Sequence, residues 1–304
     1  MRCIIIGFGV QGKKRKAFAK DDCVATVDPF NPDSDYKSIY DVDLNSFDSA
    51  LCCTPDKPKF EILKYLLTNK KHCLVEKPLW TQKQKDIINL EKIANKNNVL
   101  LYTSYNHRFE PHFIEVKNIL KKKLLGKVYH CRLFYGNGTA QLVKQSKWRD
   151  KGSGVLHDLG SHLLDTINYW FNIKKHDWKL LYSDRYENKS PDHVVIFSKM
   201  KKPRIQLEMT LLSWRNSFYC DIIGEKGSIH IESLCKWGPS KFIFRKRVLP
   251  SGKPKEKSKI LIKDDPTWEE EYKFFKKNIK KITKTDLTND LFILDELNKL
   301  IRNR

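Results

Sequence analysis

Short apolar runs alternate with helical patterns over the first 105 residues of the chain. Between the runs, apolar residues recur at helical spacing, as Ile62, Leu63 and Leu66 do. Thr81 and Gln84 form a capping-box pattern, which predicts the start of another helix. The apolar runs, which predict buried strands, are 2–6, 24–27, 50–53, 72–75 and 99–102. This alternation of strand and helix predicts a doubly wound parallel sheet of the Rossmann type, spanning residues 1–105.

The pattern changes after residue 105. Strand-like runs separated by turn signals predict a large, mostly antiparallel sheet. These runs are 127–135, 192–199, 204–213, 217–223 and 227–233. Helical patterns at 111–124 and 155–171 and a leucine-rich helical tail complete an α+β domain over residues 106–304. The pattern leaves open whether the tail packs back on the first domain. The Lys/Pro/Ser-rich segment 250–260 is predicted to be an exposed loop.

The composition agrees with two globular domains. A length of 304 residues with 40% hydrophobic residues excludes a disordered chain. No apolar run approaches the roughly 20 residues of a membrane helix, and the apolar stretch after Met1 is too short for a signal peptide. We therefore expect a cytoplasmic protein without a membrane partner. The eight cysteines form neither C-x-x-C nor zinc spacing, which predicts free thiols and no metal site.

The charge is strongly positive. Lys plus Arg is 58 and Asp plus Glu is 36, which gives a net charge of +22. Such a balance is compatible with nucleic acid, an anionic membrane surface or a phosphorylated substrate. Most of the excess is scattered lysine, typical of solvated faces, and no nucleic-acid-binding motif is present. We expect no nucleic-acid partner, and attraction of an anionic substrate stays open.

The first chemical motif is a glycine loop directly after the first strand. It reads Gly7, Phe8, Gly9, Val10, Gln11 and Gly12, a G-x-G-x-x-G pattern. Such glycines allow a tight turn and close approach of a pyrophosphate to a helix N-terminus. Asp28, at the end of the second strand, is placed to accept hydrogen bonds from ribose hydroxyls. Pro29, Phe30 and Asn31 offer no cation for a 2′-phosphate, which favours NAD over NADP. The alternative is an ordinary glycine turn beside a surface aspartate.

The second motif, Glu76-Lys77-Pro78, directly follows the fourth strand. Ligands of parallel sheets bind at the carboxyl ends of the strands. Lys77 is therefore a candidate to donate to a substrate oxygen and stabilise developing negative charge. The alternative is an exposed lysine after a strand.

The third motif lies on the helix predicted over 155–171. Asp158 and His162 are one turn apart and lie on the same face. A carboxylate beside an imidazole orients it and raises its basicity, which suits a general acid–base histidine. The alternative is a His–Asp pair that stabilises the helix surface.

These motifs, in this order, resemble the Gfo/Idh/MocA family of sugar and inositol dehydrogenases over nearly the whole chain. Further matching segments are Cys52–Pro55, Asn106–Pro111, Trp148–Arg149 and Gly224–Ser228. The resemblance implies that Lys77, Asp158 and His162 are catalytic. It also implies cofactor contacts from residues 7–12, Asp28, Thr54, Pro55, Glu76, Lys77, Trp148 and Arg149, and substrate contacts from Lys77, Asn106, Arg108, Asp158 and His162.

The implied activity is NAD-dependent hydride transfer at a hydroxyl carbon of a sugar, nucleotide sugar or cyclic polyol. His162 would take the hydroxyl proton, Lys77 would bind the reacting oxygen, and the enzyme would be a homodimer or homotetramer. One alternative is a non-catalytic dinucleotide- or sugar-sensing protein of the same fold. Others are a keto or imino reductase and an enzyme that retains NAD through an oxidation–reduction cycle. Only 25 residues separate Asp28 from Thr54, so we expect short or missing helices there.

Overall fold

The chain forms two compact units. The computed structural model describes all residues except 82, 147–148, 174–177, 200–202, 282–283 and 303–304. Unit 1 comprises Met1–Asn106 and Thr267–Leu294, and unit 2 comprises His107–Pro266 and Asp295–Arg304. Sequence analysis divides the chain once, between residues 105 and 106. The structure places residues 267–294 in unit 1, whereas the predicted division places them in the second domain.

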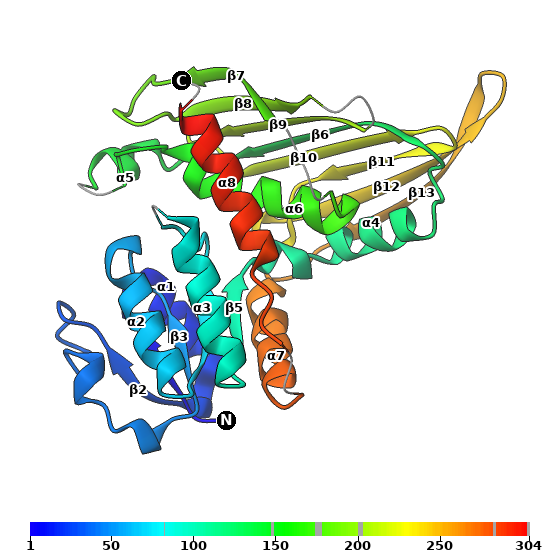
Figure 1. Ribbon diagram of the computed structural model, residues 1–304. Coiled ribbons are helices and arrows are strands. Elements are labelled where there is room, and N and C mark those ends of the chain that lie inside the picture. The colour runs from blue at the N-terminus through cyan, green and yellow to red at the C-terminus, as the bar shows by residue number, and fades with distance from the viewer. Residues whose placement is uncertain (82, 147–148, 174–177, 200–202, 282–283, 303–304) are drawn as a thin grey trace. The chain divides into compact units, whose positions relative to one another are not determined.

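Unit 1 is built on a five-stranded parallel sheet (Figure 1). Its strands are β1 (Cys3–Ile6), β2 (Cys23–Val27), β3 (Ser49–Cys52), β4 (His72–Glu76) and β5 (Leu101–Ser104). They lie in the order β2-β1-β3-β4-β5, and every pair is parallel. The predicted parallel sheet is therefore confirmed, and the carboxyl ends of its strands meet along one edge.

Helices cover both faces of this sheet. They are α1 (Val10–Ala19), α2 (Asp56–Thr68), α3 (Gln84–Lys96), α7 (Thr267–Ile279) and the first part of α8 (Thr288–Arg302). Leu63 of α2, Leu90 of α3 and Leu294 of α8 belong to the apolar cluster on one face. Ala19 of α1 and Phe275 of α7 belong to the cluster on the other. The sheet is doubly wound, as predicted.

Two local features of unit 1 bear on the predictions. Residues 28–48, all of them described, form no helix longer than the 3₁₀ turns Ile39–Asp41 and Leu44–Ser46, so the expected shortening is confirmed. The predicted capping box is wrong. Helix α3 begins after Lys83, and the Thr81 hydroxyl, two residues earlier, donates to the Asp86 carboxylate at 2.7 Å.

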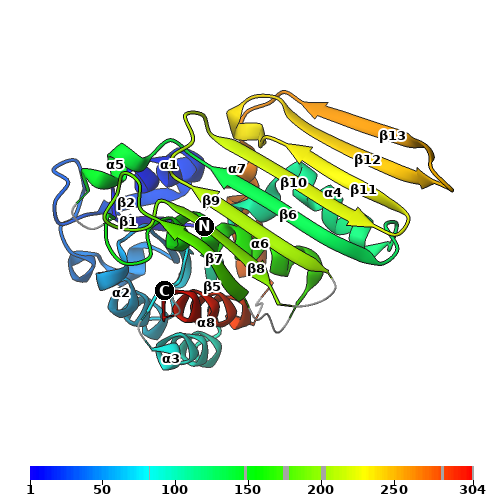
Figure 2. The same ribbon diagram turned by 90° about the horizontal axis from the view of Figure 1, so that it is seen from above.

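Unit 2 is built on an eight-stranded sheet, seen from above in Figure 2. Its strands are β6 (Val128–Gly136), β7 (Trp178–Asp184), β8 (His193–Ser198), β9 (Arg204–Thr210), β10 (Ser217–Gly224), β11 (Gly227–Glu232), β12 (Ser240–Val248) and β13 (Gly252–Leu261). The order is β13-β12-β11-β10-β6-β9-β8-β7, and only the neighbours β6 and β9 are parallel. The predicted large, mostly antiparallel sheet is confirmed.

Two helices of unit 2, α4 (Pro111–Lys121) and α6 (Ser161–Phe171), pack through aromatic rings. Unit 2 also contains α5 (Ala140–Lys144), the last part of α8, and 3₁₀ turns at Cys235–Trp237 and, shared with unit 1, at Asn106–Phe109. The Phe113 ring of α4 lies 4.9 Å from Trp170 of α6 and 5.1 Å from Phe218 of β10. This packing joins the two helices to the sheet. Within the described part of the chain, no helix is long and apolar enough to cross a membrane.

Two predictions for unit 2 need correction. The segment 250–260 is not a loop, because Gly252–Leu261 pairs with β12 as the exposed edge strand β13. The predicted helix over 155–171 is not a uniform α-helix. It begins with the π turn Leu156–Gly160 and continues as α6. The π turn ends two residues before His162, which matters for the site below.

Candidate active site

The glycine loop joins β1 to α1, and its geometry requires glycine at two positions. Gly7 has a φ of +88°, and a Cβ there would lie 2.6 Å from the Cys53 carbonyl oxygen. A Cβ on Gly12 would lie 2.1 Å from the Gly7 carbonyl oxygen, so Gly12 allows the helix to approach the strand. At Gly9, by contrast, a Cβ would meet nothing within 4 Å. The loop is tight on its protein side and open above Gly9.

The start of α1 offers unsatisfied donors beside this open space. Gly9 is the N-cap, no side chain caps the helix, and no acidic residue stands in its first turn. The first backbone N–H groups of a helix have no partner within the helix, and its N-terminus favours anions. Val10 is 73% exposed, so solvent reaches this end. The loop therefore fits the pyrophosphate of a dinucleotide.

Asp28 lies against the glycine loop. Its carboxylate accepts hydrogen bonds from the backbone N–H groups of Phe8 (2.7 Å), Phe30 (2.9 Å) and Asn31 (3.0 Å). The Asn31 side chain donates to the Phe8 carbonyl at 2.6 Å. Burial alone would raise the pKa of Asp28, but these three donors outweigh burial and lower it. The carboxylate is thus ionised at neutral pH and keeps about one acceptor site for a ligand.

The ends of β3 and β4 carry the other predicted residues of unit 1. Thr54 and Pro55 lie between β3 and α2, and Glu76 is the last residue of β4. Lys77 follows directly and is half-buried. Because the strands are parallel, these residues and the glycine loop all follow carboxyl ends of the same sheet, the edge at which such sheets bind ligands.

A buried lysine that sequence analysis missed holds the backbone around Lys77. Lys59 of α2 is 3% exposed, and its ammonium pairs with Asp56 at 2.7 Å. The ammonium also donates to the carbonyl oxygens of Glu76 (3.3 Å) and Pro78 (3.2 Å). Lys59 thus fixes the chain on both sides of Lys77.

A second missed group is the buried arginine of α1. Arg15 is 1% exposed and contacts the carboxylates of Glu76 at 2.7 Å and Glu271 at 2.9 Å. It also donates to the Ser104 hydroxyl, which itself donates to Glu271 at 2.7 Å. The Trp268 ring lies 4.3 Å from the guanidinium. Arg15 therefore ties together α1, the ends of β4 and β5, and α7, with Glu76 one residue from Lys77.

The predicted substrate residue Asn106 has a partner in unit 1. Its side-chain amide donates to the Thr267 hydroxyl at 2.7 Å, and Asn106 is only 7% exposed. The bond joins the chain after β5 to the start of α7. The Asn106 contact with substrate stays a prediction.

Asp158 lies in the π turn of unit 2, and His162 lies in the first turn of α6 that follows it. The Asp158 carboxylate is 3.4 Å from Arg149, and both side chains are about one-third exposed. His162 is 8% exposed, and its ring stacks on His107 with centroids 4.1 Å apart. The Tyr135 ring of β6 lies 6.1 Å from His162. Asp158 thus pairs with the predicted residue Arg149, while His162 lies in a cluster of rings that sequence analysis missed.

The remaining two predicted residues of unit 2 are Arg108 and Trp148. Arg108 forms an ion pair with buried Asp165, one turn after His162 on α6. Arg108 thus lies on the same helix face as the candidate base but is engaged with a carboxylate. Trp148 lies outside the described residues.

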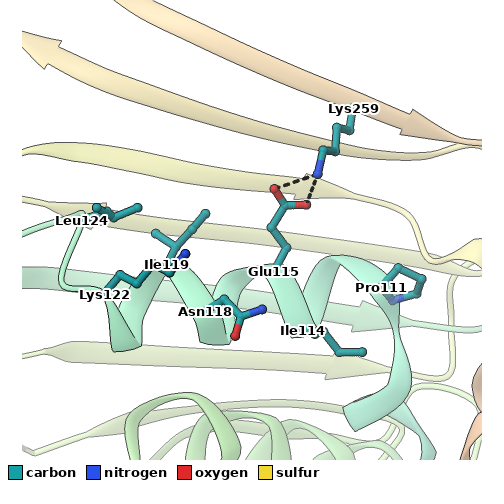
Figure 3. Close-up of a pocket in the computed structure, with 8 residues that line it drawn as sticks. All are labelled: Pro111, Ile114, Glu115, Asn118, Ile119, Lys122, Leu124 and Lys259. Carbon is teal, nitrogen blue, oxygen red and sulfur yellow. Dashed lines mark hydrogen bonds and ion pairs between the residues drawn. The ribbon is translucent and has the colours of Figure 1, made fainter.

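A separate hollow runs along α4 (Figure 3). Its volume is about 370 Å³, and Ile114, Ile119 and Leu124 contribute apolar walls. The Lys259 ammonium of β13 bonds both oxygens of the Glu115 carboxylate, at 3.0 and 2.9 Å, across it. None of the predicted site residues lines this hollow, so it does not enter the functional proposal.

The two-sheet fold is shared with solved oxidoreductases. Levoglucosan dehydrogenase in complex with NADH aligns with a TM-score of 0.82 at 16% identity, over 99% of this chain and 97% of that chain. GenD2 from gentamicin A biosynthesis, in complex with NAD, aligns with a TM-score of 0.80 at 14% identity, over 100% of this chain and 94% of that chain. At these identities the comparison defines the fold class, a Rossmann-type domain with a second, large-sheet domain.

Sequence comparison finds similarity to one family over part of the chain. Residues 113–230 match the model of the GFO/IDH/MocA C-terminal domain. The uncharacterized oxidoreductase YdgJ of Escherichia coli is 26% identical over 60% of this chain and 53% of its own length. The scyllo-inositol 2-dehydrogenase (NADP(+)) IolW of Bacillus subtilis is 26% identical over 41% of this chain and 35% of its own length. The chain thus spans about half or less of these relatives. Its resemblance to the Gfo/Idh/MocA family is confirmed.

Proposed function

We propose that this protein is a nicotinamide-dependent oxidoreductase acting on a hydroxyl carbon of a sugar, nucleotide sugar or cyclic polyol. The observation that carries the proposal is the glycine loop, which is closed by Gly7 and Gly12 and open above Gly9. The names of the relatives support the substrate class, because they include an inositol dehydrogenase and a glucose-6-phosphate 3-dehydrogenase.

NAD is the proposed cofactor. The open space at Gly9 and the free N–H groups of α1 would hold its pyrophosphate, and Asp28 would accept from a ribose hydroxyl. The remaining proposed cofactor contacts are Thr54, Pro55, Glu76, Lys77, Trp148 and Arg149. When bound, the nicotinamide accepts or donates the hydride. The ionised Asp28 would repel a 2′-phosphate, which supports NAD over NADP, although IolW is named for NADP.

The chain's own residues would handle the proton and the reacting oxygen. His162 takes the hydroxyl proton as a general base, and Lys77 donates to the same oxygen and stabilises negative charge that develops there. Asp158 holds His162 or a neighbouring hydroxyl, and Asn106 and Arg108 bind the substrate. The stack of His107 on His162 limits rotation of the candidate base. Lys59 and Arg15 keep Lys77 in place through its neighbours.

The proposal predicts that two single variants separate chemistry from binding. Lys77→Ala and His162→Ala should each lower turnover by about a hundredfold or more, the usual contribution of acid–base and electrostatic catalysis, while NADH binding largely persists because most of the proposed cofactor contacts remain. Steady-state hydride transfer, followed by NADH absorbance across a panel of sugars and nucleotide sugars, measures this. The exposed Lys64→Ala and His130→Ala are matched controls.

Titration of the wild type with NADH and NADPH tests the cofactor before any substrate is known. We expect tighter binding of NADH. Wild-type rates in both Lys77→Ala and His162→Ala would refute the mechanism. Binding of neither dinucleotide by protein freed of prebound cofactor would refute the oxidoreductase proposal itself.

A further inference from the structure

Lys236 lies on a turn whose conformation is fixed by a buried acid. The turn Cys235–Trp237 follows β11, and the Cys235 N–H donates to the Glu110 carboxylate at 3.0 Å. Glu110 is 1% exposed and Cys235 is 2% exposed. Because both ends of this bond are buried, it fixes the backbone of the turn that carries Lys236.

The Lys236 ammonium lies among aromatic rings, and no ion pair joins it to a carboxylate in the described part of the chain. It donates to the Tyr135 hydroxyl at 3.3 Å and lies 4.4 Å from the centre of the Trp237 ring. Among the described residues, no carboxylate oxygen comes within the 4.0 Å of an ion pair with it. An ammonium has three donors, so the Tyr135 hydroxyl leaves two of them to water or a ligand.

Two of the three carboxylates whose charges act on Lys236 are engaged with other groups. Burial lowers the pKa of Lys236, and the charges of Asp265, Glu110 and Asp158 oppose that effect from a distance. Glu110 accepts from Cys235 at 3.0 Å, and Asp158 is 3.4 Å from Arg149. A half-buried cation whose direct hydrogen bond, among the described residues, is to a neutral hydroxyl is costly, and a bound anion would offset that cost.

Tyr135 connects this cation to the candidate base. Its ring lies 6.1 Å from His162 and 5.5 Å from Trp237, and its hydroxyl accepts from Lys236. Lys236 is therefore one side chain removed from His162 within unit 2. A group bound against the Tyr135 ring could thus contact both His162 and Lys236.

We infer that Lys236 binds an anionic substituent, a carboxylate or a phosphate, of the substrate that reacts at His162. The inference rests on the proposed function for the presence of a substrate at His162. A lysine ammonium is a point charge that accepts either anion. Lys236 would thus select acidic sugars or sugar phosphates over neutral sugars, with Trp237 beside the bound group.

Calorimetric titration of the full chain, with and without NADH, tests the inference without turnover. The ligands are D-glucose, D-glucuronate and D-glucose 6-phosphate. We expect the wild type to bind at least one of the two anionic sugars about tenfold or more tightly than glucose. Lys236→Met should abolish that preference, and Lys236→Arg should keep most of it. Lys255→Met, which removes an exposed lysine of β13, is the matched control.

The outcomes are distinct. Equal binding of the three sugars by the wild type, or a preference that survives Lys236→Met, overturns the inference. If Lys236→Met does not fold, as judged by thermal unfolding, Lys236→Gln takes its place. The anion whose binding weakens more in the variant identifies the substituent. Loss of the preference in Lys236→Met, with no hydride transfer by the wild type, supports anion binding by Lys236 and contradicts the proposed function.

Discussion

At the scale of single residues, the most unusual group of unit 1 is a fully buried glutamate. Burial raises the pKa of Glu271 to about 7, although Arg15 lowers it. An unfolded glutamate titrates at about 4.3. The folded state therefore binds an extra proton between these values. Its contribution to stability is fully present below about pH 4.3 and is lost as the pH rises through about 7.

Glu271→Gln should remove this pH dependence. Between about pH 4.5 and 8, the wild type should lose about 3 kcal/mol of unfolding free energy relative to the variant, since each pKa unit is worth about 1.4 kcal/mol. Urea denaturation of both proteins at several pH values measures the difference. For Glu269→Gln, an exposed change on the same helix, the difference in unfolding free energy from the wild type should not change with pH in this range. If the difference between the wild type and Glu271→Gln is also independent of pH, the raised pKa of Glu271 is contradicted.

Asp28 couples the cofactor preference to the conformation of the glycine loop. Asp28→Ala removes both the proposed ribose contact and the acceptor of the Phe8 N–H. We expect NADH to bind about tenfold or more weakly, and its advantage over NADPH to narrow. Fluorescence titration with both dinucleotides measures this, with the exposed Asp33→Ala as control. An unchanged NADH-to-NADPH ratio would refute the role of Asp28.

Sequence analysis found the residues with local signatures and missed those with distant partners. Gly7, Gly12 and Asp28 follow from spacing within one strand–helix unit. Arg15, by contrast, bonds Glu76, Ser104 and Glu271, which lie 61, 89 and 256 positions away. Nothing within α1 distinguishes this arginine from the exposed lysines around it, so its burial depends on the assembled fold.

At the scale of elements, composition misled the prediction for β13. Gly252–Leu261 is rich in lysine and contains a proline, and both are rare in central strands. The segment nevertheless forms a strand because β12 offers an unpaired edge. Lysines and proline are also the residues with which proteins protect an exposed edge from pairing with another chain. A segment rich in lysine and proline is thus compatible both with a loop and with an edge strand that resists pairing with another chain.

Removing the lysines should expose this edge. The triple change Lys253→Thr, Lys255→Thr and Lys257→Thr should cause concentration-dependent association, measured by light scattering, because threonine favours strands and carries no charge. The same three-lysine change at residues 121–123, an exposed segment at the end of α4, removes equal charge away from the edge. Equal association of both triple variants would attribute the effect to net charge instead.

At the scale of the whole molecule, the change from alternating strands and helices to successive strands predicted both sheets. The assignment of α7 to unit 1 was not predicted, whereas sequence analysis left open that the leucine-rich tail packs on the first domain. The sequence does contain a helical pattern for α7, because apolar residues recur at helical spacing at Trp268, Tyr272, Phe275 and Ile279. The residues that α7 contacts lie about 250 positions earlier in the chain. Asp22, for example, accepts a hydrogen bond from the Tyr272 hydroxyl at 2.8 Å.

The π turn before His162 has a consequence for alignment with relatives. A π turn closes its hydrogen bond one residue later than an α turn, so Leu156–Gly160 contains one residue more than an α-helix of the same course. A homologue with a continuous α-helix here matches this chain only if a one-residue gap is opened before His162. An ungapped alignment would shift either Asp158 or His162 by one position and so pair it with a side chain on a different face.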